Sequence, residues 1–184
     1  MEKNIAIEIN NTKDEVIGIY DENDNYIGKD TRKNMRKNNL IHRVTYIIVA
    51  NEKGEILVQT RSLKKEYCPG FLDAVIGGVV MDGEDVQISA EREVNEEIGI
   101  DAKGKLNFID KFFLNQDICK CWIYCYYLKL NEKEINTIQF KDKEISSIKW
   151  INKSELIKML NEPNIKITEG SKKAIIYCSS KNII

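Results

Sequence analysis

The stretch that decides the fold covers residues 78–100 and reads GVVMDGE, DVQISAE, REVNEEIGI. It predicts a helix from about Asp85 to Ile98, followed by Gly99, a residue suited to the left-handed conformation that ends many helices. A helix advances by about 100° per residue, so its apolar residues form one stripe that faces a core. The stripe consists of Val86, Ala90, Val94 and Ile98.

Three carboxylates gather beside this stripe, with Glu93 and Glu97 at its edge and Glu96 next to them. Like charges at this spacing repel by ~0.2–0.5 kcal/mol per exposed pair, and more when shielded from water. Hard cations such as Mg²⁺ or Mn²⁺ would remove the repulsion, neutralise phosphate oxygens and lower the pKa of a bound water. The helix therefore suits pyrophosphate hydrolysis. The alternative, on helix geometry alone, is a solvated acidic helix with Arg92 as its counter-charge.

Outside this helix, the chain alternates between strand and helix patterns. We expect strands over residues 43–50, 55–59, 105–113, 119–130 and 145–151, and a strand–turn–strand unit over 15–29. The strands 43–50 and 55–59 are expected to form a hairpin. The basic stretch 31–39 reads as a linker or a turn of helix, and further helices are expected from Asn152 to about Leu160 and over 168–178. The fold class is a mixed α/β (α+β) domain.

Length and composition favour one soluble domain. The 184 residues are 42% hydrophobic, and their net charge of −1 gives no global reason to expect nucleic-acid or membrane binding. No uninterrupted apolar run approaches the ~18 residues that span a bilayer. Acidic residues stand where a signal peptide needs an apolar block, so a cytoplasmic location is the default expectation. We expect residues 1–30 to form an N-terminal β-hairpin appendage and residues 31–184 the main domain.

The five cysteines do not form a disulfide-scaffold pattern. Cys119, Cys121 and Cys125 fall on one face of a strand with a period of two. A zinc site would usually show a two-residue gap and a second pair of ligands, and the only histidine, His42, is far away in sequence. We therefore interpret these cysteines as small buried hydrophobic residues rather than as zinc ligands.

The full spacing of residues 78–100 carries a family resemblance. Gly78, five residues, Glu84, seven residues, Arg92-Glu93, an aliphatic, any residue, Glu96-Glu97, any residue, Gly99 and an aliphatic resemble a complete Nudix box. The resemblance implies an α/β/α sandwich built on a mixed sheet, with a catalytic loop–helix–loop. It also implies a Nudix hydrolase (a pyrophosphatase) that cleaves a phosphoanhydride bond in a nucleoside diphosphate derivative or a related diphosphate, with Mg²⁺ or Mn²⁺ as cofactor.

Carried onto this sequence, the Nudix resemblance implies a site that binds the metal. Its carboxylate ligands would be Glu93, Glu96 and Glu97. The backbone carbonyl of Gly77, just before the box glycine Gly78, would be another ligand. Arg92 and Glu84 would form a supporting ion pair that orients the carboxylates.

Further candidates lie outside the box. Family members often take a base or an extra ligand from a later strand or loop, and Glu144 is the candidate here, with Asp142 as the nearest competing acid. His42, at a strand start, and Arg61, with its planar fork, are candidates for contacts with the substrate phosphates. The alternative for His42 is a purely structural role.

A second resemblance extends from about residue 13 to residue 160. Segments 42–44, 56–62 and 69–73 are similar to the Nudix branch related to isopentenyl-diphosphate isomerase. True isomerases place a cysteine and a histidine metal ligand just after the Pro-Gly segment, whereas residues 73–78 contain neither. Isomerase-like activity and a non-catalytic nucleotide-binding module are thus the alternatives to hydrolysis. The expected partner is a small-molecule diphosphate, and a homodimer through the N-terminal hairpin is a further possibility.

Overall fold

The computed structural model describes residues 15–65, 67–140 and 144–181. Their strands are β1 (Val16–Tyr20), β2 (Tyr26–Thr31), β3 (His42–Ala50), β4 (Ile56–Arg61), β5 (Leu72–Asp73), β6 (Asn107–Gln116), β7 (Cys119–Lys129) and β8 (Ile145–Ile151). Their helices are α1 (Arg32–Lys37), α2 (Val86–Ile98), α3 (Glu132–Ile135), α4 (Lys153–Asn161) and α5 (Glu169–Ser180). Among the described residues, no helix has both the length and the apolar character needed to cross a membrane.

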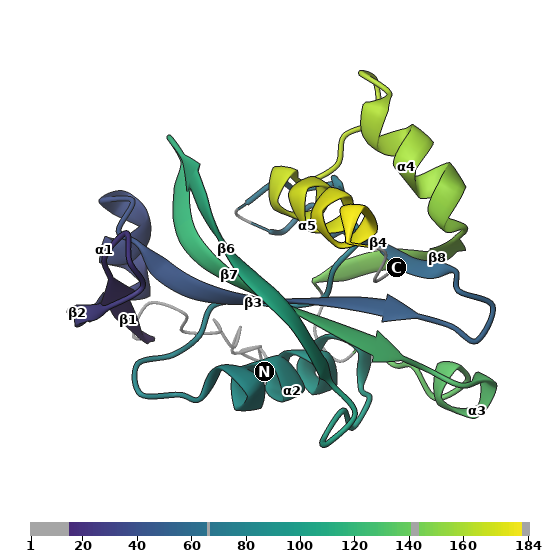
Figure 1. The fold of residues 1–184 in the computed structure, drawn as a ribbon, viewed down its shortest axis with the longest axis horizontal. Helices are drawn as coiled ribbons and strands as arrows, with labels where there is room; N and C mark the ends of the chain where they lie inside the picture. Colours follow the sequence, from purple (N-terminus) through teal and green to yellow (C-terminus); the bar gives the residue numbers. More distant parts are fainter. Residues whose placement is uncertain (1–14, 66, 141–143, 182–184) are drawn as a thin grey trace, which may run out of the picture.

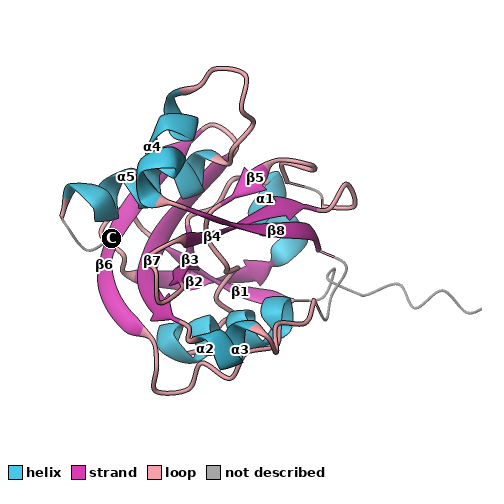
Figure 2. Ribbon diagram, turned by 90° about the vertical axis from the view of Figure 1, so that its right-hand side faces the viewer, coloured by secondary structure: helices cyan, strands magenta, loops and turns pink. Residues whose placement is uncertain are grey.

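The main sheet is mixed and lies between two layers of helices. Its strand order is β5-β4-β3-β7-β6, with β8 paired to β4. β3 and β7 are parallel, in a register that runs from His42 opposite Cys121 to Ala50 opposite Lys129, and the other pairings are antiparallel. Helix α2 covers one face, and α4 and α5 cover the other (Figures 1 and 2). The expected α/β/α sandwich is confirmed.

Strand alternation divides the interior into two cores. From β3, Ile47 and Val49 pack on the side of α2, in a cluster with Val94 of that helix. Val44 and Ile48 point the other way and pack in a cluster with Ile175 of α5. Because each fully buried aliphatic side chain contributes about 1.5–3 kcal/mol, β3 holds both layers in place.

Helix α2 begins and ends where the sequence predicts. Asp85 caps its first turn by accepting hydrogen bonds from the amides of Gln87 and Ile88. Gly99 ends it with φ of 75°, in the left-handed region. Ala90, Val94 and Ile98 of the apolar stripe are buried and Val86 is partly buried, so the stripe packs against the face of the sheet.

The expected hairpin of β3 and β4 is only partly correct. The two strands are antiparallel, but they pair at a single position, Ala50 opposite Ile56. Beyond it, β4 pairs with β5 and β8 instead. The edge of β3 is filled by the segment that leads into α2, through bridges from Ile47 to Ile76 and from Val44 to Val79. Stretch 31–39 contains helix α1, one of the two expected alternatives, and the short helix α3 was not expected.

The N-terminal hairpin of β1 and β2 is docked on the sheet. Asp24 in its turn is buried and accepts hydrogen bonds from Arg43 Nε at 2.7 Å and from the Tyr124 hydroxyl at 2.5 Å. Trp122 Nε1 donates to the carbonyl of Asp21 at 3.1 Å. The hairpin is therefore fastened to β3 and β7. Residues 1–14 lie outside the described residues, and the domain boundary at residue 30 stays a prediction.

Candidate active site

Glu93 rests directly against the backbone of Gly78. A Cβ atom on that glycine would lie 2.6 Å from Glu93 Oε1, far inside normal contact. Gly78 is itself fixed, because its carbonyl accepts a hydrogen bond from the amide of Thr45 at 2.9 Å. Burial raises the pKa of the Glu93 carboxyl, against the partial compensation that Arg92 provides. The box glycine thus leaves the space in which this largely buried carboxylate sits.

A glycine is required at position 77 because the backbone of β3 passes close to it. Its φ of +149° lies in the region that favours glycine, and a Cβ here would lie 1.8 Å from the carbonyl oxygen of Thr45. The clash would be with backbone, which cannot swing aside as a side chain can. The two neighbouring glycines therefore do separate things: Gly77 lets the loop run along β3, and Gly78 admits Glu93.

The other two helix acids differ in exposure. The residue Glu97 is only 4% exposed, and its carboxylate accepts a hydrogen bond from Gln59 Nε2 at 3.3 Å. Gln59 also donates to the carbonyl of Val75 at 2.8 Å, so its amide is held from two sides. The side chain of Glu96 is 53% exposed. The acid group therefore extends from the buried Glu97 to the exposed Glu96.

Arg92 braces this group of acids. Its Nε and Nη2 donate to the two carboxylate oxygens of Glu84 at 2.9 and 3.1 Å, which is the expected supporting ion pair. Its Nη1 donates to Glu93 at 2.8 Å and to Glu96 at 2.9 Å. Burial would raise the pKa of Glu84, but the Arg92 hydrogen bonds and the amide of Met81 outweigh it, so the net pKa is lowered. Glu84 is thus held as a carboxylate.

The donor set fits a hard divalent cation. The carboxylates of Glu84, Glu93 and Glu96 all pair with the guanidinium of Arg92, and Glu97 lies on the same helix against Gln59, so the acids outnumber this cation in a half-buried place. Arg92 Nη1 already bridges two of these carboxylates as a cation would. Carboxylate oxygens are the ligands that Mg²⁺ and Mn²⁺ prefer. Glu93, Glu96, Glu97 and the Gly77 carbonyl are the residues that would hold such an ion.

The candidates outside the helix are engaged in other contacts. Glu144, just before β8, forms an ion pair with Lys65, and its carbonyl accepts from the Ser62 amide. Arg61 donates through Nη1 to Asp73 at 3.1 Å, and through Nε and Nη2 to the carbonyl of Tyr67. The catalytic role of Glu144 and the phosphate contact of Arg61 stay predictions. Asp142 lies outside the described residues.

His42 lies in a cluster that the sequence interpretation missed. A ligand atom of His42 and the thiols of Cys119 and Cys121 all lie within 4.8 Å of one another. Burial lowers the pKa of the imidazole to about 4, so it is neutral at pH 7. His42 is far from the cysteines in sequence but close to them in the structure, because the parallel register of β3 and β7 places His42 opposite Cys121. Cys121 and Cys125 are buried, as expected.

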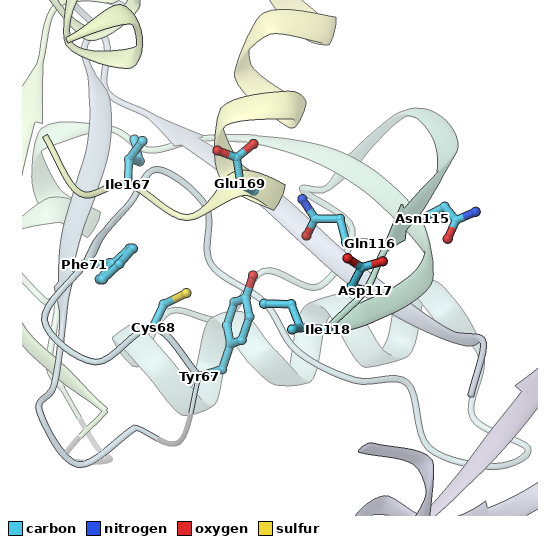
Figure 3. Close-up of a pocket in the computed structure, with 9 residues that line it drawn as sticks. All are labelled: Tyr67, Cys68, Phe71, Asn115, Gln116, Asp117, Ile118, Ile167 and Glu169. Atoms are coloured by element: carbon cyan, nitrogen blue, oxygen red, sulfur yellow. The ribbon is translucent and has the colours of Figure 1, made fainter. Parts of the chain in front are cut away.

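A cavity of about 700 Å³ opens beside the turn that joins β6 to β7 (Figure 3). Its other walls are the loop after β4 and the start of α5. The lining residues are Tyr67, Cys68, Phe71, Asn115, Gln116, Asp117, Ile118, Ile167 and Glu169. No acid of α2 is among them. Its size lies within the range of roughly 300–1,000 Å³ typical of small-molecule sites.

The sandwich and its glycine-supported, arginine-braced acidic helix define a Nudix-type fold and site. The NUDIX domain family model matches residues 40–170, and the chain belongs to this family. It is 42% identical over 110 residues to a Nudix hydrolase of Yersinia pestis, a match that covers 59% of each chain. It is 31% identical over 170 residues to the Nudix hydrolase YfcD of Escherichia coli strain K12, covering 91% of this chain and 88% of that one.

A solved structure shares the fold over nearly its whole length. The protein DR0079 from Deinococcus radiodurans superposes with a TM-score of 0.77 at 22% identity, covering 89% of this chain and 99% of that chain. Such a likeness supports the fold, and the relatives with higher identity support the family. Hydrolase is thus the enzyme class to which the chain is assigned.

Proposed function

We propose that the protein is a Mg²⁺- or Mn²⁺-dependent hydrolase that cleaves a phosphoanhydride bond in a nucleoside diphosphate derivative or a related small diphosphate. The observation that carries this proposal is the packing of the Glu93 carboxylate against Gly78 within the acid group braced by Arg92. A purely structural helix gains nothing from burying these like charges together. A site for hard cations explains both the acids and the glycines.

The residues of the chain divide the work. When bound, the cation supplies charge neutralisation for the phosphates and a water of lowered pKa. Arg92 and Glu84 set the direction of the carboxylates, and Gln59 holds Glu97 in place. Glu96 or Glu97 accepts the proton of the attacking water, and Glu144 is the candidate for this role outside α2.

The cavity beside the β6–β7 turn is the proposed place for the part of the substrate that does not react. Figure 3 shows Tyr67 and Phe71 among its walls, together with the amide of Gln116 and the carboxylate of Glu169. Aromatic rings with a few polar groups suit a flat heterocycle and its sugar. Dimerisation through the β1–β2 hairpin stays a prediction, which light scattering after size exclusion would test.

The test is a panel of nucleoside diphosphate derivatives and simple organic diphosphates with Mg²⁺ or Mn²⁺. We expect at least one to be cleaved, and Glu97→Gln to lower kcat by about 100-fold or more, since a positioned proton acceptor contributes about 10²–10⁴-fold. Glu91→Gln is the matched control, because Glu91 lies on the same helix outside the group and hydrogen-bonds Gln87 and the Gly104 amide.

Three results would overturn the proposal. If no diphosphate is cleaved but nucleotides bind, the protein is a binding module. If solvent deuterium enters an allylic diphosphate without phosphate release, it is an isomerase. Equal activity of Glu97→Gln and the wild type with a cleaved substrate would remove the acid group from the mechanism.

A further inference from the structure

A second group of metal-ligating side chains lies on the face of the sheet opposite α2. It consists of His42 at the start of β3 and of Cys119 and Cys121 at the start of β7, with ligand atoms within 4.8 Å of one another. Cys121 packs in the core cluster that includes Ile175 of α5, and strand alternation places Cys119 on the same face. Helix α2, which carries the acids, packs on the other face, so this group shares no residue with the acid group.

The spacing of the two thiols suits a tetrahedral ion. Cys119 Sγ and Cys121 Sγ are 3.8 Å apart. Two thiolates at the usual Zn–S distance of about 2.3 Å, separated by a tetrahedral angle, are about 3.8 Å apart. Strand β7 therefore already holds the two sulfur atoms at the separation that zinc requires.

A hydrogen bond selects the nitrogen that His42 can offer to a metal. Its Nδ1 lies 2.9 Å from the carbonyl oxygen of Leu40. A carbonyl only accepts, so Nδ1 carries the proton and Nε2 carries the lone pair. Metal-bound histidines are commonly oriented by such a bond from the second ring nitrogen. The residue is 5% exposed, so the ring is also held by packing.

The backbone around the group is tied together from both strands. Asn39, three residues before His42, donates through Nδ2 to the carbonyls of Gln116 at 3.0 Å and Asp117 at 2.9 Å, in the turn before Cys119. The loop that leads into β3 and the turn that leads into β7 are thus fastened to each other. A metal site needs this kind of fixed backbone support.

We propose that His42, Cys119 and Cys121 bind one Zn²⁺ ion and leave its fourth ligand position open. Two thiolates and a neutral imidazole balance the charge of Zn²⁺, which suits a largely buried place. Cys119 is the half-exposed member of the group, so an ion can reach the site from solvent. Thiolate and imidazole ligands favour zinc strongly over Mg²⁺, whereas the carboxylates of α2 suit Mg²⁺ and Mn²⁺.

The test uses the purified full chain, stripped with a chelator and reloaded with Zn²⁺ or Co²⁺. We expect about one tightly bound zinc per chain that excess Mg²⁺ does not displace, and a thiolate-to-cobalt charge-transfer band with Co²⁺. Cys119→Ser should weaken zinc binding by more than about 100-fold, since loss of even an outer-shell partner costs about 10–100-fold. Cys119 is half-exposed, so this variant is expected to fold, and its circular dichroism spectrum checks that.

Two control variants make the result specific. Cys125→Ala removes a thiol from the same face of β7, four residues after Cys121. This variant should bind zinc like the wild type. Glu97→Gln should also keep zinc binding, which separates this proposal from the proposed function. The proposal is overturned if the reduced wild type binds no zinc, if Cys119 and Cys121 are found joined as a disulfide under reducing conditions, or if Cys125→Ala weakens binding as much as Cys119→Ser.

Discussion

Substituting Gly78 by alanine should damage the site while leaving the fold intact. The added Cβ would lie 2.6 Å from Glu93 Oε1, and ordinary contact begins at 3.4 Å, so the carboxylate must move by about 0.8 Å. The obstacle is the end of a flexible side chain. Alanine also reduces the entropy of the unfolded chain, which offsets part of any strain. We expect the free energy of unfolding to change by less than about 1 kcal/mol.

The displacement of Glu93 should be costly for function. A misplacement of about 1 Å in a catalytic group can reduce the rate by about 10²-fold, and disturbed metal ligands lose roughly 10–100-fold in affinity. Free Mn²⁺ measured by electron paramagnetic resonance gives the affinity without any knowledge of the substrate. We expect the Mn²⁺ affinity of Gly78→Ala to fall by about 10–100-fold, with a midpoint of urea unfolding close to that of the wild type.

The neighbouring glycine supplies the contrasting control. In Gly77→Ala the new Cβ would lie 1.8 Å from the backbone oxygen of Thr45, at φ of +149°. Strain of about 1–3 kcal/mol from the dihedral alone, plus the clash, should lower Tm by at least about 4 °C. The reasoning is refuted if Gly78→Ala binds Mn²⁺ like the wild type, or if it destabilises the protein as much as Gly77→Ala does.

Three further predictions concern the supports of the fold and the site. Asp24→Asn should cost about 2 kcal/mol of stability at pH 7. Burial raises the pKa of Asp24, but its hydrogen bonds outweigh burial, so the net pKa is lowered. The stability advantage of the wild type over Asp24→Asn should therefore vanish as the pH falls below about 4, which acid titrations of unfolding would show. Gln59→Leu should lower Mn²⁺ affinity by about 10-fold, because Glu97 loses its donor, and an unchanged affinity would contradict this. Arg61→Ala should destabilise the protein by about 3 kcal/mol, since it leaves the buried Asp73 without its ion-pair partner; a raised KM at unchanged stability would instead support a phosphate contact.

The helix of the site was predictable because its determinants are local. The cap at Asp85, the left-handed Gly99 and the stripe from Val86 to Ile98 all lie within one turn or one face of a single helix. The i, i+4 spacing of Glu93 and Glu97 likewise fixes their common side of the helix, whatever the rest of the chain does. Which of the acids is buried was not predictable, because it depends on Gln59 of β4 and on the glycine loop.

The partners of β3 were not predictable in the same way. The strong turn after Ala50 favoured a hairpin, yet nearly the whole strand pairs with β7 and with the segment before α2. Strand register between distant segments is set by packing of both faces, which leaves no local signal in the sequence. The same limit hid the approach of His42 to Cys121, since sequence separation says nothing about which strands become neighbours.

β3 connects the two proposed metal sites, although they lie on opposite faces. The amide of Thr45 donates to the carbonyl of Gly78, and Ile47 pairs with Ile76. The loop that contains Gly77 and Gly78 is therefore hydrogen-bonded to the middle of β3. His42 stands at its start, opposite Cys121. A zinc ion on the α5 face would fix the start of β3 against β7, and so steady the strand from which the loop beneath Glu93 is held. The two sites differ in the metal that they favour, because the sulfur and imidazole donors of β7 and β3 favour zinc whereas the oxygen donors of α2 suit Mg²⁺ and Mn²⁺.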